Sequence, residues 1–318
     1  MLLQIEDLVV SYRTRAGLVR AVDGVSLSIA AGQSVGLVGE SGCGKTTVTR
    51  ALLRILPPNG FIERGRVLLE GVDLTRLSAS EMRRVRWRRI AMVPQSAMNA
   101  LNPVLRVGDQ LVETIRIHEH VDAAAAWRRA EDLFERVGIE RRRLYDYPHQ
   151  FSGGMAQRVM IGIGMSCVPS LLIADEPTTA LDVTIQAQIL ALIRRLAREM
   201  GVAVLLVSHD LGIISQMCHR VLVMYAGRIV EEAPIATIFG SPTHPYTRGL
   251  MACLPGLDGR GRLEVIAGTM PGLTAIPPGC RFHPRCPLAE ARCAVEEPKL
   301  RPAGAGTTHL AACHLVGA

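Results

Sequence analysis

Alternating apolar and polar side chains mark the beginning of the chain. Residues 2–10 and 19–29 alternate with a period of two, as half-buried strands do, and residues 12–17 predict a hairpin loop between them. Farther along, continuous apolar runs predict buried strands and amphipathic stretches predict helices, an alternation typical of an α/β fold with a parallel sheet. The predicted strands are 34–38, 65–70, 171–175 and 202–207, with a hairpin of 221–225 and 228–231; the predicted helices are 46–56, 80–117, 122–137 and 185–200.

The periodicity fades after residue 239, where proline and glycine become frequent. We therefore predict a main domain over residues 1–240 and a small irregular extension over residues 241–318. Helical periodicity between the two groups of strands predicts a helical subdomain at about residues 96–158. With 318 residues, of which 48% are hydrophobic, the chain is long enough to bury one large core and carry an appendage.

The apolar stretches are too interrupted to predict a transmembrane helix. The longest, residues 160–174, is broken by glycine, serine and proline and falls short of a membrane span. The N-terminus carries acidic residues at once and lacks the basic region of a signal peptide. We therefore expect a cytosolic chain, and any membrane that it serves to be crossed by other chains. A net charge of +7 suits phosphates, anionic lipid or nucleic acid alike and does not choose among them.

A complete phosphate-binding loop lies between the predicted strand 34–38 and the predicted helix 46–56. Its sequence, Gly39-Glu40-Ser41-Gly42-Cys43-Gly44-Lys45-Thr46-Thr47, has the form G-x-x-x-x-G-K-[ST] in the strand–loop–helix setting that the motif requires. Lys45 is one of only two lysines beside 34 arginines, and a compact ammonium fits a tight glycine loop where a planar guanidinium does not. We predict that the chain binds a nucleoside triphosphate, ATP, through Gly39, Ser41, Gly42, Cys43, Gly44, Lys45, Thr46 and Thr47.

Hydrolysis of a phosphoanhydride needs a metal ion and a base as well as this loop. Lys45 is expected to neutralise the β- and γ-phosphates, and the hydroxyl of Thr46 to bind Mg²⁺. Asp175 ends an apolar run that predicts a central strand, so its carboxylate is the candidate for a second Mg²⁺ ligand. Glu176 follows directly and is the candidate to accept a proton from the attacking water.

Further motifs in the chain resemble those of ATP-binding-cassette (ABC) ATPases. Residues 151–158 resemble the signature motif of that family, Gln95 its Q-loop, residues 180–182 its D-loop, residues 208–210 its switch histidine and Tyr12 its adenine-stacking aromatic residue. The resemblance covers residues 1 to about 240. It implies an α/β cassette with a RecA-like P-loop core, an antiparallel β subdomain and an α-helical subdomain. It also implies that Gln95 helps to hold Mg²⁺ with Thr46 and Asp175, and that His209 holds the γ-phosphate and orients the water.

The signature motif implies a dimer. Ser152, Gly153 and Gly154 open a predicted helix, so their amides and hydroxyl form a second phosphate cradle. One chain cannot fold both cradles around one γ-phosphate. The family resemblance implies a head-to-tail dimer, in which Ser152, Gly153 and Gly154 contact the ATP held by the partner.

Two further segments narrow the resemblance to one group of transporters. Residues 98–103 and 244–250 resemble the ATPase subunits of oligopeptide and dipeptide importers, a group that also includes nickel and glutathione importers. This implies a second ATPase subunit, a paralogue, together with two transmembrane permeases. It also implies an extracytoplasmic substrate-binding protein, and a peripheral position at the cytoplasmic face of the inner membrane.

Four cysteines, at positions 280, 286, 293 and 313, crowd into the C-terminal extension and resemble a motif of the same group. Four thiolates can hold zinc or a 4Fe–4S cluster. The spacings lack the Cys-x-x-Cys pairs of zinc ribbons, so an iron–sulfur cluster is favoured, with zinc or no metal as alternatives. Arg281, Arg285 and Arg292 would then offset the charge of the cluster. His283, His309 and His314 are possible replacement ligands, but we expect them not to bind the metal.

Three alternatives stay open. A non-transport ABC protein acting on DNA or ribosomes would need coiled coils, zinc-finger insertions or two fused cassettes. The sequence shows none of these, and we expect no nucleic-acid partner. A P-loop kinase or GTPase would not need Ser-Gly-Gly and a switch histidine. Import of nickel, glutathione or a sugar in place of peptides is the third alternative, since this chain does not contact the cargo.

Overall fold

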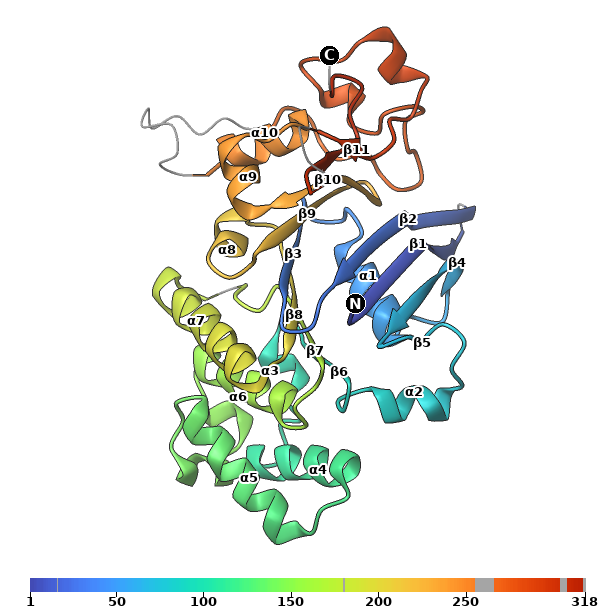
Figure 1. The fold of residues 1–318 in the computed structure, drawn as a ribbon. Coiled ribbons are helices and arrows are strands. Elements are labelled where there is room, and N and C mark those ends of the chain that lie inside the picture. The colour runs from blue at the N-terminus through green and yellow to red at the C-terminus, as the bar shows by residue number, and fades with distance from the viewer. Residues whose placement is uncertain (16, 180, 255–265, 304–307, 317–318) are drawn as a thin grey trace.

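Two sheets organise the chain in the computed structural model, which describes all residues except 16, 180, 255–265, 304–307 and 317–318 (Figure 1). The larger sheet has the strand order β11-β12-β10-β9-β3-β8-β7-β6. The strands from β9 to β6 pair in parallel, whereas β10, β12 and β11 add antiparallel pairs at the other edge. The bounds are β3 Ser34–Val38, β6 Ile90–Val93, β7 Leu171–Asp175, β8 Ala203–Ser208, β9 Arg220–Tyr225, β10 Arg228–Pro234, β11 Arg301–Pro302 and β12 Leu310–Ala311.

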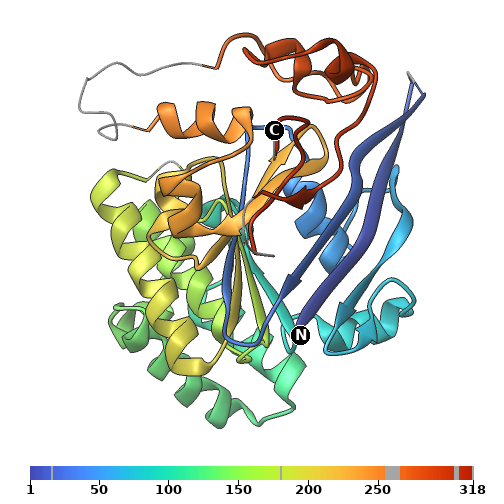
Figure 2. The ribbon, with the colours of Figure 1, turned by 45° about the horizontal axis from the view of Figure 1, so that its top comes forward.

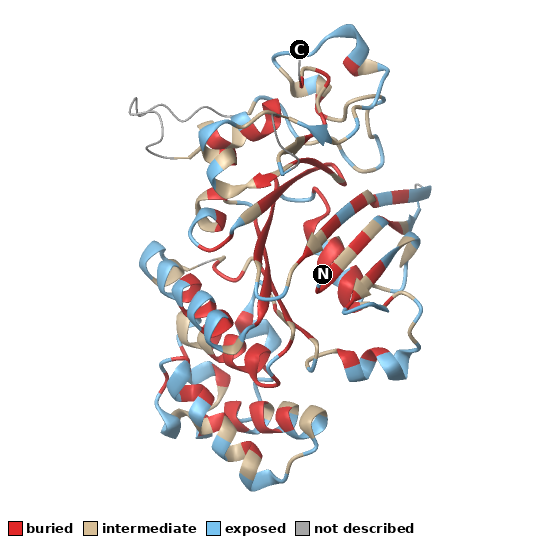
Figure 3. Cartoon of the chain, in the orientation of Figure 1, coloured by how far each residue is buried: buried red, intermediate tan, exposed pale blue. Residues whose placement is uncertain are grey.

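The strands at the centre of this sheet are buried on both faces, as their continuous apolar sequences predict (Figure 3). In β7, Leu172 and Ala174 face one hydrophobic cluster and Leu171 and Ile173 face the other. The alternation places one layer of the protein on each side of the sheet. The predicted α/β fold is therefore confirmed.

The smaller sheet is antiparallel, with the order β2-β1-β4-β5. Its strands are β1 Leu3–Thr14, β2 Gly17–Ile29, β4 Gly60–Leu69 and β5 Val72–Asp73. Helix α1 (Lys45–Leu53) lies between this sheet and the central one, and its buried Val48 and Leu52 belong to the cluster that joins the two sheets. The first predicted hairpin is confirmed. β4 begins five residues earlier than the predicted strand 65–70, at Gly60.

Helices cover the other face of the central sheet (Figures 1 and 2). They include α6 (Gly153–Met165), α7 (Val183–Met200) and α8 (Leu211–Ser215). Helices α4 (Val107–Glu119) and α5 (Ala123–Arg136) pack against each other and against α6, together with the short helices α3 (Ala97–Ala100), η1 (Arg141–Tyr145) and η2 (Pro148–Gln150). None of the described helices is long and apolar enough to cross a membrane.

The prediction of helix throughout residues 80–117 is wrong in its middle part. Helix α2 (Ala79–Val85) ends before strand β6 (Ile90–Val93), and helical structure resumes only at Ala97. β6 is a four-residue apolar run that pairs in parallel with β7 at the edge of the sheet. This strand follows an arginine-rich segment and is too short to show a period of its own, so the sequence pattern does not predict it.

The C-terminal part of the chain returns to the central sheet. After α9 (Ile235–Gly240) and α10 (Pro245–Ala252), the segment with η3 (His283–Arg285) and η4 (Ala291–Ala294) lies against β9, β10 and α10 (Figures 1 and 2). Strand β12 then pairs with β10, with Glu231 opposite Ala311. This segment is irregular, as predicted, and is packed against the main body of the protein.

Candidate active site

The phosphate-binding loop connects β3 to α1, and glycine is required at both of its ends. Gly44 has φ +112°, and a Cβ there would lie 2.3 Å from the carbonyl oxygen of Ala21. A Cβ at Gly39 would lie 2.1 Å from the carbonyl oxygen of Met224. These distances are impossible for a real side chain, so the backbone of neighbouring strands forces glycine into the loop. The loop thereby leads in a tight turn into the N-terminus of α1, a favourable place for phosphate oxygens.

Lys45 is the first residue of α1, and its side chain is buried over this loop, with 4% of the residue exposed. Its Nζ donates to the carbonyl oxygens of Gly39, at 2.6 Å, and Glu40, at 3.0 Å. The ammonium is thus held at the centre of the loop by the backbone at its beginning. Cys43 is fully buried below the loop, and burial raises the pKa of its thiol. Its thiol therefore packs into the core and does not line the loop surface.

Asp175 ends β7 and faces the beginning of α1. Its Oδ2 accepts a hydrogen bond from Thr49 Oγ1 at 3.2 Å, whereas its Oδ1 is buried with no hydrogen-bond partner among the described residues. Burial raises the pKa of this carboxyl, and the negative charge of the neighbouring Glu176 raises it further. Hydrogen bonds from the hydroxyls of Thr49 and Thr46 oppose this shift. A buried carboxylate oxygen without a partner, beside a threonine hydroxyl, fits the oxygen ligands of Mg²⁺.

Three candidate catalytic side chains meet beyond the ends of three adjacent strands. Glu176, directly after β7, accepts a hydrogen bond from Gln95 Nε2 at 3.1 Å; Gln95 follows β6. The same Oε2 of Glu176 lies 3.4 Å from Nδ1 of His209, which follows β8. Thr179 Oγ1 donates to this oxygen as well, at 3.0 Å. The parallel strand order β8-β7-β6 therefore brings together residues that are far apart in the sequence.

Tyr12 lies near the end of β1 and contacts the loop from the antiparallel sheet. Its hydroxyl is 3.2 Å from Oγ1 of Thr47, and its ring packs beside Gly60. The chain thus brings this aromatic residue to the edge of the same site.

Gly153 and Gly154 open α6, and Ser152 precedes them. Ser152 is exposed and caps the helix by accepting a hydrogen bond from the Met155 amide at 3.4 Å. Helices α6 and α1 pack on opposite faces of the central sheet. A single chain therefore leaves this second cradle away from its own phosphate loop. Of the predicted D-loop, Ala180 lies outside the described residues, and Asp182 caps α7 by accepting from the Ile185 amide at 2.9 Å.

The four C-terminal cysteines do not form a ready-made metal site: Cys280 and Cys286 flank η3, Cys293 lies in η4 and Cys313 follows β12. No group of three or more His, Cys, Asp or Glu side chains in the described part of the chain is arranged to hold a metal ion. Burial raises the pKa of Cys280 to about 11, and the other three thiols add to the shift. The thiols are therefore within electrostatic reach of one another.

Arg281, Arg285 and Arg292, which were expected to offset the charge of a cluster, are each paired with a carboxylate in this structure. The partners are Asp23, Glu40 and Glu290, respectively. The three nearby histidines are also engaged elsewhere: His309 with Glu231, His314 with the carbonyl of Glu296 and His283 with the carbonyl of Cys280.

Some residues of the site were not predicted. Thr49 and Thr179 bind the two acidic side chains, and their spacing carries a signal: Thr49 is one helical turn after Lys45 and Thr179 is three residues after Glu176. Glu40 contacts Tyr246 and Arg285 from the C-terminal segment. No local pattern in the sequence announces these long-range contacts.

Comparison with known proteins agrees with this geometry. Residues 22–179 match the family of ABC transporters, and residues 230–293 match the C-terminal region of oligopeptide/dipeptide transporters. The chain is similar to the dipeptide transport ATP-binding protein DppD of Bacillus subtilis (strain 168), with 47% identity over 289 residues, covering 90% of this chain and 86% of that protein.

The fold is similar to solved structures of ATP-binding cassettes. One is the cassette MJ0796 as a dimer in a post-hydrolysis state bound to ADP and Pi, with 25% identity and a TM-score of 0.66 over 73% of this chain and 98% of that one. Another is cbiO1 from Clostridium perfringens, part of the transporter complex cbiONQ, with 25% identity and a TM-score of 0.65 over 76% of this chain and 91% of that one.

Proposed function

This chain belongs to the ABC transporter family as the ATP-hydrolysing subunit of a peptide importer, and we propose that the residues at the ends of β3, β6, β7 and β8 carry out the hydrolysis. The observation that carries the proposal is the contact of Glu176 with both Gln95 and His209, beside the phosphate loop. These groups surround the place where a water molecule would attack the γ-phosphate.

In the proposed site, Lys45 and the loop amides bind the β- and γ-phosphates, and Tyr12 stacks on the adenine. Thr46, Gln95 and Asp175 would hold Mg²⁺, which neutralises phosphate charge when bound. The partnerless Oδ1 of Asp175 supports this ligand set. Glu176 accepts the proton of the attacking water, and its bonds from Gln95 and Thr179 fix the direction of the carboxylate. His209 orients the water and the γ-phosphate from the opposite side.

The importer contains a dimer of ATPase subunits and transmembrane permeases, as membership of this family implies. We propose that ATP is bound between the phosphate loop of one subunit and Ser152, Gly153 and Gly154 of the other, and that the partner is a paralogue. The exposed position of Ser152 on the opposite face of the sheet from α1 supports a contribution in trans. Closure of the dimer on ATP and reopening after hydrolysis would drive the permeases.

A groove beside β6 is proposed to receive a helix of a permease at the cytoplasmic face of the membrane. It encloses about 460 Å³ between β6, α3 and α4, and its apolar lining includes Trp87, Met92, Leu101 and Leu105. Gln95 lies two residues after the end of β6, so a shift of this wall moves a residue that contacts Glu176. The groove thereby connects the permease with the hydrolysis site.

Peptides are the cargo that the relatives favour, since the similar protein from Bacillus subtilis is named for dipeptide transport. The experiment that tests this is uptake into vesicles containing the complete importer, with labelled di- and oligopeptides as substrates. ATP-dependent uptake of peptide is expected. Uptake of nickel or glutathione without peptide uptake would assign another cargo to the same machinery.

The C-terminal cysteines are proposed to hold a 4Fe–4S cluster in a structural or regulatory role, with zinc as the alternative. Cys280, Cys286, Cys293 and Cys313 would be the ligands, and their mutual electrostatic influence supports the grouping. Since the thiols form no ready metal site, they must move closer together to bind a cluster. Iron and sulfide analysis of anaerobically purified protein tests this. One equivalent of zinc, or no metal, would overturn the cluster assignment.

A further inference from the structure

The C-terminal segment contacts the phosphate loop through Arg285. Nη1 of this arginine lies 3.0 Å and 3.1 Å from the two carboxylate oxygens of Glu40, the second residue of the loop. The Arg285 side chain is 6% exposed and that of Glu40 29% exposed, so the ion pair is largely shielded from water. An ion pair in such surroundings fixes the position of both side chains more firmly than a surface pair does.

Glu40 is held at its backbone as well as at its side chain. Its amide donates to the hydroxyl of Tyr246 at 2.9 Å. Tyr246 lies in α10 and is fully buried. Its carbonyl accepts from Lys45 Nζ at 3.0 Å. The position of Glu40 therefore determines where the loop begins and where the ammonium of Lys45 rests.

Arg285 is itself held firmly by the C-terminal segment. Phe282, 2% exposed, packs against Tyr225 and Tyr246 with ring centroids 5.2 Å and 5.4 Å apart. The guanidinium of Arg285 lies 5.8 Å from the Tyr225 ring centroid, and its Nε donates to the carbonyl of Ala267 at 2.9 Å. These contacts give Arg285 a fixed base from which to hold Glu40.

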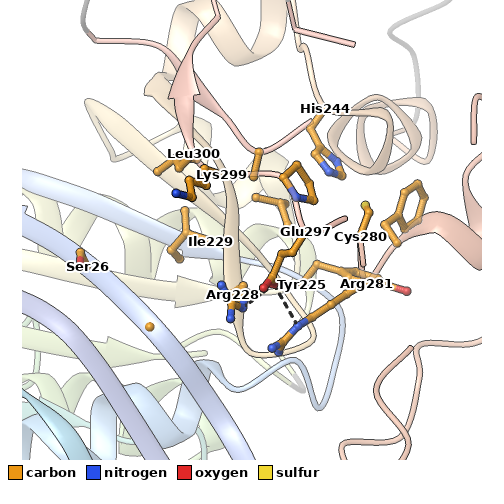
Figure 4. A pocket seen from close by; sticks show the side chains of 15 residues that line it. Ser26, Tyr225, Arg228, Ile229, His244, Cys280, Arg281, Glu297, Lys299 and Leu300 are labelled. Atoms are coloured by element: carbon orange, nitrogen blue, oxygen red, sulfur yellow. Dashed lines mark ion pairs between the residues drawn. The ribbon is translucent and has the colours of Figure 1, made fainter. Parts of the chain in front are cut away.

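A second arginine of this segment, Arg281, lines the adjoining cavity, where it forms an ion pair with Glu297 (Figure 4). Arg281 contacts Asp23 of β2 and donates to the carbonyl oxygen of Ala226, in the turn between β9 and β10. The next residue of that turn, Gly227, donates its amide to the carbonyl oxygen of Cys43, at 2.8 Å. Arg281 thus reaches the loop through the turn, whereas Arg285 reaches it directly.

We propose that Arg285 is a positioning residue for ATP binding, which holds the phosphate loop in its phosphate-accepting shape through Glu40. This rests on the ATPase activity of the chain and requires neither a particular cargo nor a C-terminal metal. Without Arg285, the free protein would populate other loop shapes, and ATP would have to select the competent one. The apparent affinity for ATP is then reduced in proportion to the fraction of the protein whose loop is in the competent shape. Once ATP is bound, the loop has the same shape, so kcat is preserved.

The test uses the full chain with Arg285→Gln, Glu40→Gln and the double variant. We expect each to raise the KM for ATP roughly tenfold, as for the loss of a hydrogen bond to a charged group, with kcat within about twofold of the wild type. The KM of the double variant should be no higher than that of the single variant with the higher KM, because both changes remove the same contact. Arg285→Lys should restore part of the affinity, since it keeps the charge but not the fork.

Arg142→Gln is the matched control, because Arg142 forms an exposed ion pair with Glu140; it should change neither constant. A KM that stays unchanged in both single variants would overturn the proposal, as would additive effects in the double variant. A lower unfolding temperature with unchanged KM would show a merely structural contact. Should Glu40→Gln fail to fold because it leaves Arg285 buried and unpaired, Arg285→Gln and Arg285→Lys still decide the matter. A loss of kcat well beyond twofold would also overturn the proposal, because the contact would then act on hydrolysis as well as on ATP binding. Absence of hydrolysis in the wild type would instead count against the proposed function.

Discussion

Gln95 Nε2 donates a hydrogen bond to Glu176 Oε2 across 3.1 Å, joining two residues that are 81 positions apart in the chain. Gln95 stands between the proposed permease groove and the proposed base. A movement of β6 would therefore reach the proposed base, and would couple the state of the permease to the rate of hydrolysis.

Replacing Glu176 with Gln is expected to preserve ATP binding and to reduce turnover by about 10²–10⁴-fold, the usual contribution of a general base. The amide keeps the size of the side chain but cannot accept the proton of water. ATP binding is measured with a fluorescent analogue, and turnover by phosphate release. Glu199→Gln is the control, since Glu199 lies on the outer surface of α7 and pairs with Arg136 and Arg195. Wild-type turnover in Glu176→Gln would remove this residue from its assigned role.

Gly44→Ala is expected to abolish nucleotide binding. Gly44 has φ +112°, and its new Cβ would lie 2.3 Å from the Ala21 carbonyl, so the loop must leave its present shape. Gly240→Ala is the matched control, because a Cβ there meets nothing within 4 Å. Equilibrium binding of ATP to the two purified variants checks the difference. Retention of wild-type affinity by Gly44→Ala would mean that the loop does not need this geometry to bind phosphate.

Ser152 allows the proposed contribution in trans to be separated from its role as a helix cap. Asn and Asp both cap helices well, so Ser152→Asn and Ser152→Asp should keep α6 stable. Only Asp brings a negative charge to the γ-phosphate of the partner's ATP. We expect Ser152→Asp to bind ATP as a single subunit but to fail in ATP-driven dimerisation and turnover, while Ser152→Asn remains active in part.

Light scattering of the Glu176→Gln subunit with its partner ATPase, with and without ATP, measures this dimerisation. Each Ser152 change is introduced into the same background. Equal dimerisation of the Asp and Asn variants would contradict an approach of Ser152 to the triphosphate.

The sequence allowed most of the site to be predicted, because its motifs are local. Lys45 and Thr46 stand within one loop, and Asp175 and Glu176 at the end of one apolar run. The loop and the two acidic residues lie close together because the strands that precede them are parallel, and parallel strands have their carboxyl ends at one edge of the sheet.

The contacts between distant segments could not be predicted in this way. Arg285 and Glu40 are 245 positions apart, and no pattern in the sequence links the two positions. Packing within one hydrophobic cluster decides this pairing, since Phe282 packs beside Tyr225 and thereby brings Arg285 to the loop. β6 was not predicted for a local reason, since its four residues are too few to establish a period.

The stability of the protein should depend on pH through His244. This residue is buried where β10, α10 and Phe282 meet; its amide donates to Glu231, and its Nδ1 accepts from the Tyr246 amide at 3.1 Å. Burial lowers its pKa to about 3, and the charge of Arg248 acts in the same direction. In the unfolded chain the pKa of histidine is about 6.5.

Between these two values the unfolded chain binds a proton at His244 and the folded chain does not, so stability rises with pH and is lost as pH falls below about 6.5. The loss attributable to this residue is about 2 kcal/mol at pH 5. His244→Asn keeps a capping side chain without a titrating group, and its unfolding free energy should fall less between pH 7 and pH 5. Urea unfolding of both proteins at the two pH values measures the difference. Equal losses in wild type and variant would show that His244 is protonated in the folded protein as readily as in the unfolded chain.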